Sequence, residues 1–231
     1  MSWYSGGMRG GLTGGYAWQR DHAPDPPPSP PELRPPAFFA GLDLGQTSDP
    51  SALVVVERTT VPNPDKPGST QNHFSVRHLH RWPLMTSYPQ IVADVKALYT
   101  EPQLKGTPLV IDQTGVGRPV VDMFRASGIT ASLRPLSITC GRTNGPETVA
   151  KIHLVGAIQA PLTSGRLFFA EDLELTPVLV AELENFRVTV DQQTRNETFS
   201  AWRERDHDDC VLALAICLHV ANVAPVFVAW I

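Results

Sequence analysis

Cysteine is scarce in this chain of 231 residues: Cys140, Cys210 and Cys217 are its only three, and none of them forms a close-spaced pair. This excludes a disulfide framework or a zinc knuckle and is typical of a reducing cytoplasm. An excess of positive charge is also missing, because 19 Lys and Arg against 23 Asp and Glu give a net charge of −4. The charge excludes a protein that holds nucleic acid by bulk positive charge, but it leaves room for a local basic patch.

Two further features are absent. The first twenty residues contain no apolar core of about 7–15 residues, so they are not a signal peptide. No GxxxxGK[ST] motif occurs, which excludes a phosphate-binding loop of that type. The segment 210–231 has roughly the length of a membrane span, but His219 and Asn222 fall within it and Pro225 interrupts it. We therefore predict a buried helix that ends near Pro225 rather than a tail anchor, and no contact with a membrane.

Composition divides the chain in two. Hydrophobic residues make up 42% and charged residues 18%, as in a packed globular protein. Eight of the 22 prolines lie between Pro24 and Pro36, after a glycine-rich stretch. We predict that residues 1–36 are a flexible tail or linker, with a proline-rich ligand for a partner domain as the less favoured interpretation. Residues 37–231 are predicted to form the folded domain.

The hydrophobic pattern from residue 37 onward predicts an α/β fold with a mixed sheet of five or more strands flanked by helices, because three successive strands are followed by strand–helix alternation. His78 and His80 fall on one face of the third strand, as zinc ligands would, but without a visible third ligand we interpret them as exposed strand histidines. The expected strands are 37–45, 51–58, 73–82, 107–112 and 131–138, the expected helices are 88–99, 116–127, 147–162, 175–186 and 208–224, and 186–191 with 197–202 form an expected hairpin.

Acidic residues stand where elements end or begin. Asp43 is late in the first strand, Asp112 ends the strand TPLVID, and Asp208 and Asp209 open the last helix. A carboxylate in an apolar strand is costly unless something neutralises it. Several carboxylates on one rim of a sheet would repel one another, and a divalent cation relieves that repulsion, since Mg²⁺ and Mn²⁺ prefer carboxylate and water ligands. Two such ions activate a water and stabilise the leaving oxygen in phosphodiester cleavage.

Each acid also has a plainer interpretation. Asp43 could be a turn acid before Gly45, Asp112 could cap the following helix, and Asp208 could be the N-cap of the last helix. The three positions together, in this order and on these elements, favour a shared site.

The same stretches carry a resemblance. GLDLGQTSDPSALVVVE, LVIDQTGVGRPVVDMF and TFSAWRERDHDDCVLALA resemble the nuclease domain of phage terminase large subunits, and ETVAKIHLVGAIQAPLTSGRLFFA fits the helix and strand between the second and third acidic motifs. The resemblance covers residues 38–222. It implies an RNase H-like fold, related to the Holliday-junction resolvases, and a metal-dependent DNA endonuclease that cuts concatemeric viral DNA during genome packaging.

The resemblance also implies roles. Asp43 would be the central acid bridging two ions of Mg²⁺ or Mn²⁺, Asp112 the second ligand, and Asp208 or Asp209 the third, with Asp209 preferred. Asp49 and His207 would lie next to the residues that bind the ions. Asp49 would orient a metal-bound water, although it could equally be an acidic residue of the turn before Pro50. A full terminase large subunit carries an ATPase motor ahead of the nuclease, and this chain has none. The expected partners are double-stranded DNA, a separate packaging ATPase, a small terminase subunit and a portal, in the host cytoplasm.

The positive charge that could bind DNA is concentrated in one part of the sequence. Between Arg118 and Arg166 there are six Lys and Arg against two acids, an excess of four. We predict phosphate contacts from Arg118, Arg142 and Lys151, with backbone N–H groups at Gly115 and Gly117 close to a phosphate. No base-reading motif is visible, so cleavage is expected to be largely independent of sequence.

Two alternatives remain at this point. The segments DLGQT and DQTGVG resemble the phosphate turns of sugar kinases and actin-like ATPases, but the chain supplies only one of the two halves such proteins need. Tight ATP binding would favour that phosphotransferase half. The other alternative is a DNA-packaging or assembly module whose nuclease activity is latent, and metal binding separates it from an active nuclease.

Overall fold

The computed structural model describes residues 33, 35–45, 49–115, 118–139, 145–185, 189–190, 197–198 and 208–223. They form a seven-stranded sheet in the order β6-β5-β4-β1-β2-β3-β7, and a separate two-stranded pair, β8-β9. The elements are β1 (Ala37–Asp43), β2 (Ala52–Pro62), β3 (Thr70–Arg81), α1 (Tyr88–Leu98), β4 (Pro108–Asp112), α2 (Arg118–Ala126), β5 (Ser132–Thr139), β6 (Thr148–Ala150), α3 (Lys151–Thr163), β7 (Leu167–Phe169), α4 (Thr176–Asn185), β8 (Thr189–Val190), β9 (Glu197–Thr198) and α5 (Asp209–Val223).

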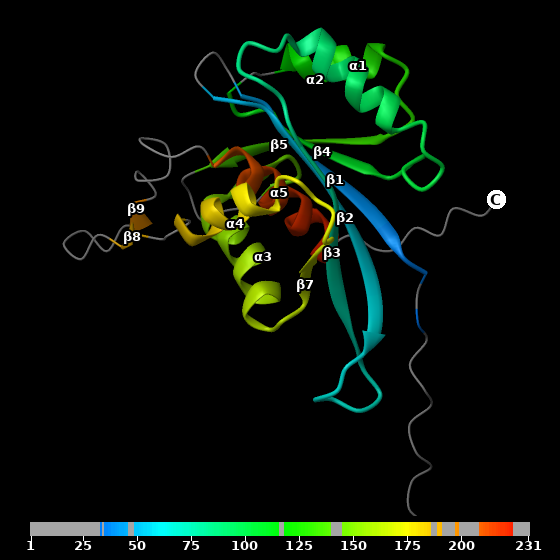
Figure 1. Cartoon of the computed structure of the whole chain (residues 1–231), viewed down its shortest axis with the longest axis vertical. Helices are drawn as coiled ribbons and strands as arrows, with labels where there is room; N and C mark the ends of the chain where they lie inside the picture. The colour runs from blue at the N-terminus through cyan, green and yellow to red at the C-terminus, as the bar shows by residue number, and fades with distance from the viewer. Residues whose placement is uncertain are drawn as a thin grey trace, which may run out of the picture.

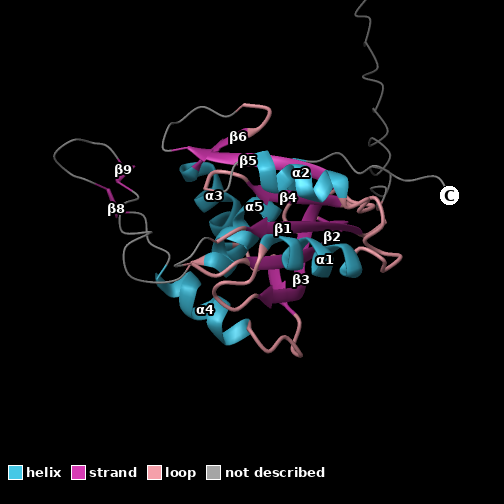
Figure 2. Ribbon diagram, turned by 90° about the horizontal axis from the view of Figure 1, so that it is seen from above, coloured by secondary structure: helices cyan, strands magenta, loops and turns pink. Residues whose placement is uncertain are grey.

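The sheet is mixed. Strand β2 is antiparallel to both β1 and β3, while β4, β5 and β6 follow β1 in parallel and β7 is parallel to β3. All strands except β2 therefore run in one direction, and their C-terminal ends share one rim of the sheet. Figure 2 shows this layer from above, with β6, β5, β4, β1, β2 and β3 side by side.

Helices cover both faces of the sheet. In Figure 1, α1 and α2 lie together on one side, and α3, α4 and α5 lie on the other. Each side encloses its own apolar core, and the strands contribute alternate residues to the two cores, as the period of two in a strand requires.

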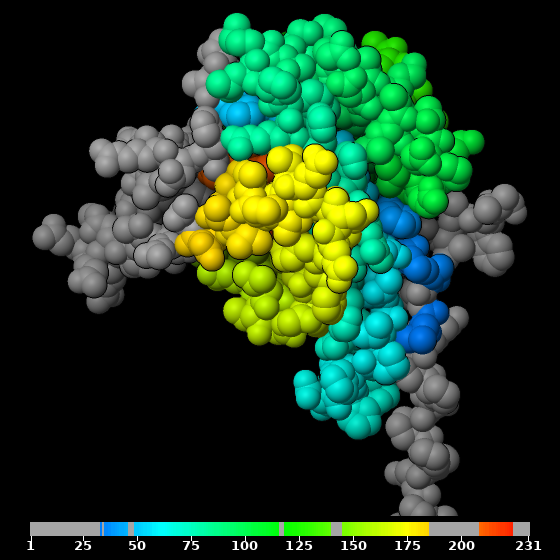
Figure 3. Space-filling view, in the orientation of Figure 1, coloured from blue at the N-terminus to red at the C-terminus, as the bar shows by residue number. Residues whose placement is uncertain are grey.

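Helix α5 is the centre of one core. From Cys210 to Leu218 every one of its residues is buried, and it packs on β1, β2, β3 and β4 as well as on α3 and α4. In the view of Figure 3, the yellow residues of α4 and of the segment before it cover most of α5. A helix that is apolar all round needs this burial on every side. The sequence prediction of a buried helix is confirmed, and none of the described helices is long and apolar enough to cross a membrane.

Most expected elements are present, with one difference. The segment from Thr148 to Ala150 was expected in a helix that starts at residue 147, but it is the short strand β6, and α3 begins only at Lys151. Because β6 pairs in parallel with the end of β5, with Ser137 opposite Thr148, the neighbouring strand supplies hydrogen bonds that the local pattern could not reveal. The expected hairpin is represented by β8 and β9, which pair antiparallel.

Candidate functional site

Asp43 lies at the C-terminal end of β1 on the face that carries α5. Along β1, Phe39 packs in the core with α5, whereas Ala40 and Leu42 pack in the core with α1 and α2. Alternation therefore turns Asp43 toward α5, and the residue is only 8% exposed. A carboxylate this deeply buried requires a compensating group nearby.

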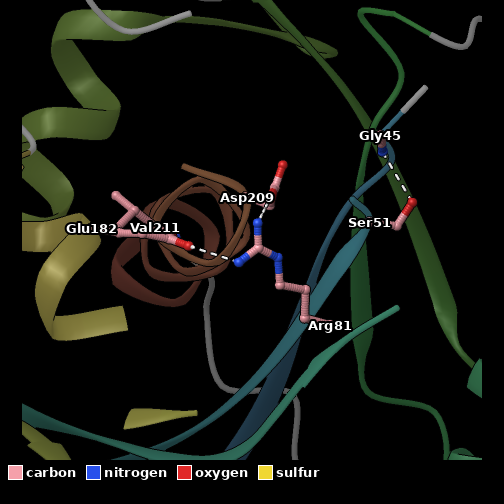
Figure 4. Close-up of polar contacts among 6 residues, drawn as sticks. All are labelled: Gly45, Ser51, Arg81, Glu182, Asp209 and Val211. Atoms are coloured by element: carbon pink, nitrogen blue, oxygen red, sulfur yellow. Dashed lines mark hydrogen bonds and ion pairs between the residues drawn. The ribbon is translucent and has the colours of Figure 1, made fainter. Parts of the chain in front are cut away.

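The chain folds back directly after Asp43. A Cβ atom on Gly45 would lie 1.9 Å from the carbonyl oxygen of Asp49, so only glycine fits there. The Gly45 N–H donates to Ser51 Oγ at 3.0 Å, a bond also drawn in Figure 4, and the Tyr88 hydroxyl donates to the Gly45 carbonyl at 3.1 Å. These bonds fix the turn at which β1 ends.

Asp112 stands beside Asp43. Strands β1 and β4 are parallel neighbours with Leu42 opposite Ile111, so the next position on each strand is an aspartate. In β4, Val110 packs in the core with α5, and alternation places Asp112 on the same face, where it is 6% exposed. The two carboxylates therefore come from adjacent strands and point to one side of the sheet.

The Asp112 carboxylate accepts hydrogen bonds within the turn that follows β4. Its Oδ1 accepts hydrogen bonds from the Thr114 N–H at 2.8 Å and from the Thr114 hydroxyl, while α2 begins only at Arg118. The Thr114 hydroxyl oxygen in turn accepts from the Ile138 N–H at 2.7 Å. Asp112 is thus part of a turn that ties β4 to β5 at the rim.

Helix α5 runs over β1 in the opposite direction, and the contacts between them fix their register. The Cys217 thiol donates to the Phe39 carbonyl at 3.3 Å. A Cβ atom on Gly41 would lie 2.1 Å from the Ala213 carbonyl oxygen. Two residues along the strand thus correspond to four residues back along the helix. This agrees with rises of about 3.3 and 1.5 Å per residue.

The same register, carried two strand residues further, places the first residue of α5 above the end of β1. That residue is Asp209, which is 2% exposed, and the end of β1 is Asp43. Asp208 immediately precedes the helix, is only partly buried, and its carbonyl accepts the Leu212 N–H at 2.8 Å. Of the two residues left open by the sequence, Asp209 is the buried one, and Asp208 occupies the N-cap position.

Two charged residues at this rim were not predicted from the sequence. Arg81, the last residue of β3, places Nη2 at 2.8 Å from Asp209 Oδ2 and Nη1 at 3.8 Å from Glu182 Oε1. Glu182 lies on α4, and its Oε2 accepts the Val211 N–H at 3.0 Å. The only sequence signal for Glu182 was its spacing, because it stands three residues after Leu179 in the predicted helix.

Burial, together with the nearby Asp209 and Asp208, raises the pKa of Glu182 to about 7, although the Val211 N–H and Arg81 act in the opposite direction. Near neutral pH a larger fraction of this carboxyl is therefore protonated than of an ordinary glutamate.

The other candidates lie in different surroundings. Asp49 is exposed, as is Arg118 at the start of α2. Lys151 is 9% exposed and begins α3, directly after the C-terminal end of β6 on the rim that carries the acids. Gly115 is exposed in the turn after β4. His207, Arg142 and Gly117 lie outside the described residues.

Two of the three cysteines and both histidines of the pair lie among the described residues, whereas Cys140 lies outside them. Cys210 and Cys217 are free and buried, and burial raises the pKa of the Cys210 thiol to about 12. The rings of His78 and His80 are 6.4 Å apart between centroids and nearly parallel. Their side chains are half-buried and exposed respectively.

Oxygen donors at the rim have the chemistry of a site for a hard divalent cation. Asp43, Asp112 and Asp209 are three buried carboxylates from three elements, and hard cations such as Mg²⁺ and Mn²⁺ take such ligands. In the described part of the chain, no group of three or more His, Cys, Asp or Glu side chains is arranged so that it could hold a metal ion as it stands. The three carboxylates therefore match a hard cation in the chemistry of their oxygen atoms alone.

Comparisons with known proteins address the fold. No protein-family model matches the chain, and the search of curated proteins gives no match. Among solved structures, the large terminase nuclease from the thermophilic phage G20c superimposes with a TM-score of 0.55 at 22% identity, covering 81% of this chain and 84% of that one. The same nuclease with bound zinc gives a TM-score of 0.50 at 21% identity, over 81% and 83% of the two chains.

The large terminase of bacteriophage HK97 also matches, with a TM-score of 0.53 at 17% identity, over 83% of this chain. The chain spans 40% of the length of that protein. These similarities show that the chain has the RNase H-like α/β fold of large terminase nucleases, as the sequence resemblance predicts.

Proposed function

We propose that the chain is a metal-dependent DNA endonuclease of the large terminase type, which cuts concatemeric viral DNA during genome packaging. The observation that carries this proposal is that Asp43, Asp112 and Asp209 are buried carboxylates at the ends of β1 and β4 and at the start of α5. The fold shared with large terminase nucleases, one of them solved with bound zinc, supports the same reaction.

Asp43, Asp112 and Asp209 would hold two ions of Mg²⁺ or Mn²⁺, with Asp43 between them. When bound, the ions supply an activated water and stabilisation of the leaving oxygen. The buried carboxylates position the ions, and the turns after Asp43 and Asp112 hold those side chains in place through Gly45 and Thr114. Asp208, Asp49 and His207 would lie around this set, with Asp49 orienting a water.

DNA would approach the same rim. Arg118, Arg142 and Lys151 are the proposed phosphate contacts; Arg118 is exposed, while Lys151 would act from within the rim because it is buried. Phosphate contacts carry no sequence information, so cleavage would be largely independent of sequence. The proposed partners are double-stranded DNA, a separate packaging ATPase, a small terminase subunit and a portal, in the host cytoplasm.

A cleavage assay tests the proposed reaction. Supercoiled plasmid is incubated with Mn²⁺ and either the wild-type chain, Asp43→Asn or Asp112→Asn. Each variant should lose activity by on the order of 10³-fold, the loss expected when several kcal/mol of transition-state stabilisation disappear. Asp122→Asn is the matched control, because this aspartate is exposed on α2 and pairs only with Arg125 among the described residues. Wild-type rates in a folded Asp43→Asn variant would show that the site is wrongly assigned.

A catalytically latent packaging module is the second candidate. It is favoured by one observation, that no ligand group is assembled among the described side chains as they stand. A wild-type chain that binds DNA but neither binds Mn²⁺ nor cuts plasmid would establish this alternative.

A further inference from the structure

Arg81 lies in the row of residues that forms the rim next to α5. Asp43 is paired with Ala52 on β2, and Ala52 with Arg81 on β3. Paired residues on neighbouring strands are about 5 Å apart and share a face, so the Arg81 Cα is roughly 10 Å from that of Asp43. The residue between them in the sheet is Ala52, whose side chain is only a methyl group.

The guanidinium of Arg81 is held between two buried carboxylates. Its Nη2 donates to Asp209 Oδ2 at 2.8 Å and its Nη1 is 3.8 Å from Glu182 Oε1, with Arg81 lying between the two acids in Figure 4. The side chains of Asp209 and Glu182 are 3% and 6% exposed, and that of Arg81 is 20% exposed. A charge-assisted bond in such surroundings is little screened by solvent.

Glu182 also binds the backbone of α5. Its second oxygen accepts the N–H of Val211, one of the first N–H groups of α5, which have no partner within the helix. Glu182 therefore ties α4 to the first turn of α5, while Arg81 ties β3 to both. Asp209 is held at the point where these three elements meet.

We propose that Arg81, anchored by Glu182, is a positioning residue that fixes the carboxylate of Asp209 for a divalent cation. The inference rests on the proposed function. Arg81 would act through its bond to Asp209 Oδ2, which restricts the rotation of that carboxylate. Partners that orient a metal-ligating carboxylate typically change metal affinity by about 10–100-fold when they are removed.

Calorimetric titration of the full chain with Mn²⁺ tests the role of Arg81. Arg81→Gln should weaken Mn²⁺ binding by about 10–100-fold relative to the wild type. Arg81→Lys should give an intermediate affinity, because lysine retains the charge but lacks the planar fork that can contact two carboxylates. Arg77→Gln is the control: it lies on the same strand, pairs with Glu57 at 2.7 Å, and should leave the affinity unchanged.

Other results of the Mn²⁺ titration would overturn the role proposed for Arg81. If Arg81 were only a positive charge that repels the cation, Arg81→Gln would bind Mn²⁺ as tightly as the wild type or more tightly, and the inference would be overturned. A thermal melt without metal shows whether Arg81→Gln is folded; if it is not, a wild-type affinity in Arg81→Lys overturns the inference instead. A wild-type chain that does not bind Mn²⁺ contradicts the proposed function, whereas equal binding by the wild type and a folded Arg81→Gln contradicts only the role of Arg81.

Discussion

The two faces of the sheet are formed by the same strands, but they carry different kinds of side chain at the rim. On the face that carries α1 and α2, the outermost core positions are apolar, as Leu44 and Trp82 show. On the face that carries α5, the corresponding positions are Asp43, Asp112 and Arg81. A core needs only apolar contacts, so the charges on one face are costly for stability and indicate a binding or catalytic role there.

A substitution at the contact between β1 and α5 should have the largest effect on both stability and metal binding. We expect Gly41→Ala to destabilise the chain by ~3 kcal/mol, because the new methyl group would lie 2.1 Å from the backbone oxygen of Ala213 and α5 would have to move. Since Asp209 moves with α5, Mn²⁺ affinity should fall as well. Urea denaturation and calorimetry measure the two effects.

Two controls sharpen this prediction. Gly156→Ala on α3 meets no atom within 4 Å and should change stability by less than ~1 kcal/mol. Phe124→Ala removes a fully buried ring from the opposite core and should cost ~3–5 kcal/mol without altering the Mn²⁺ affinity of the folded chain. An equal loss of affinity in Phe124→Ala would mean that the two faces are not independent.

A smaller, pH-dependent effect on stability is expected from Glu182→Gln. The pKa of Glu182 is raised to about 7 in the folded chain, so folding favours the protonated form. This contribution to stability is present below the unfolded pKa of 4.5 and is lost as pH rises toward 7. Glutamine keeps an oxygen for the Val211 N–H and does not ionise.

The melting temperature of Glu182→Gln should therefore rise relative to the wild type between pH 5 and pH 8. A relative gain of ~2–4 °C corresponds to about 1 kcal/mol for a chain of this size. Glu184→Gln, an exposed position on the same helix, serves as the control. A pH-independent difference between Glu182→Gln and the wild type would contradict a raised pKa.

The fold and the candidate acidic residues could be predicted from the sequence, because both leave a pattern within short stretches of the chain. Each of β1 and β4 is a short apolar run that ends in aspartate, and α5 is an apolar run that begins with one. Arg81 and Glu182 could not be placed in the same way. Arg81 reaches the site through the register of β3 on β2, which contains an irregularity between Val55 and Val56.

Other parts depended on partners distant in the chain. The three residues of β6 carry a pattern that suits a helix equally well, and only pairing with β5 makes them a strand. For Lys151, the sequence indicated a charge for DNA, while its burial follows from the packing of α3 behind the rim. Such features depend on tertiary contacts, which override local preference.

We propose that Asp43, Asp112 and Asp209 together form one site for divalent cations. A crystal of the chain soaked in Mn²⁺, with anomalous scattering recorded at the manganese edge, tests it most directly. Two manganese peaks bound by oxygens of these three aspartates are expected, with Asp43 shared between the ions. An acidic rim without manganese under conditions that saturate wild-type binding in solution, or manganese bound elsewhere, would contradict it.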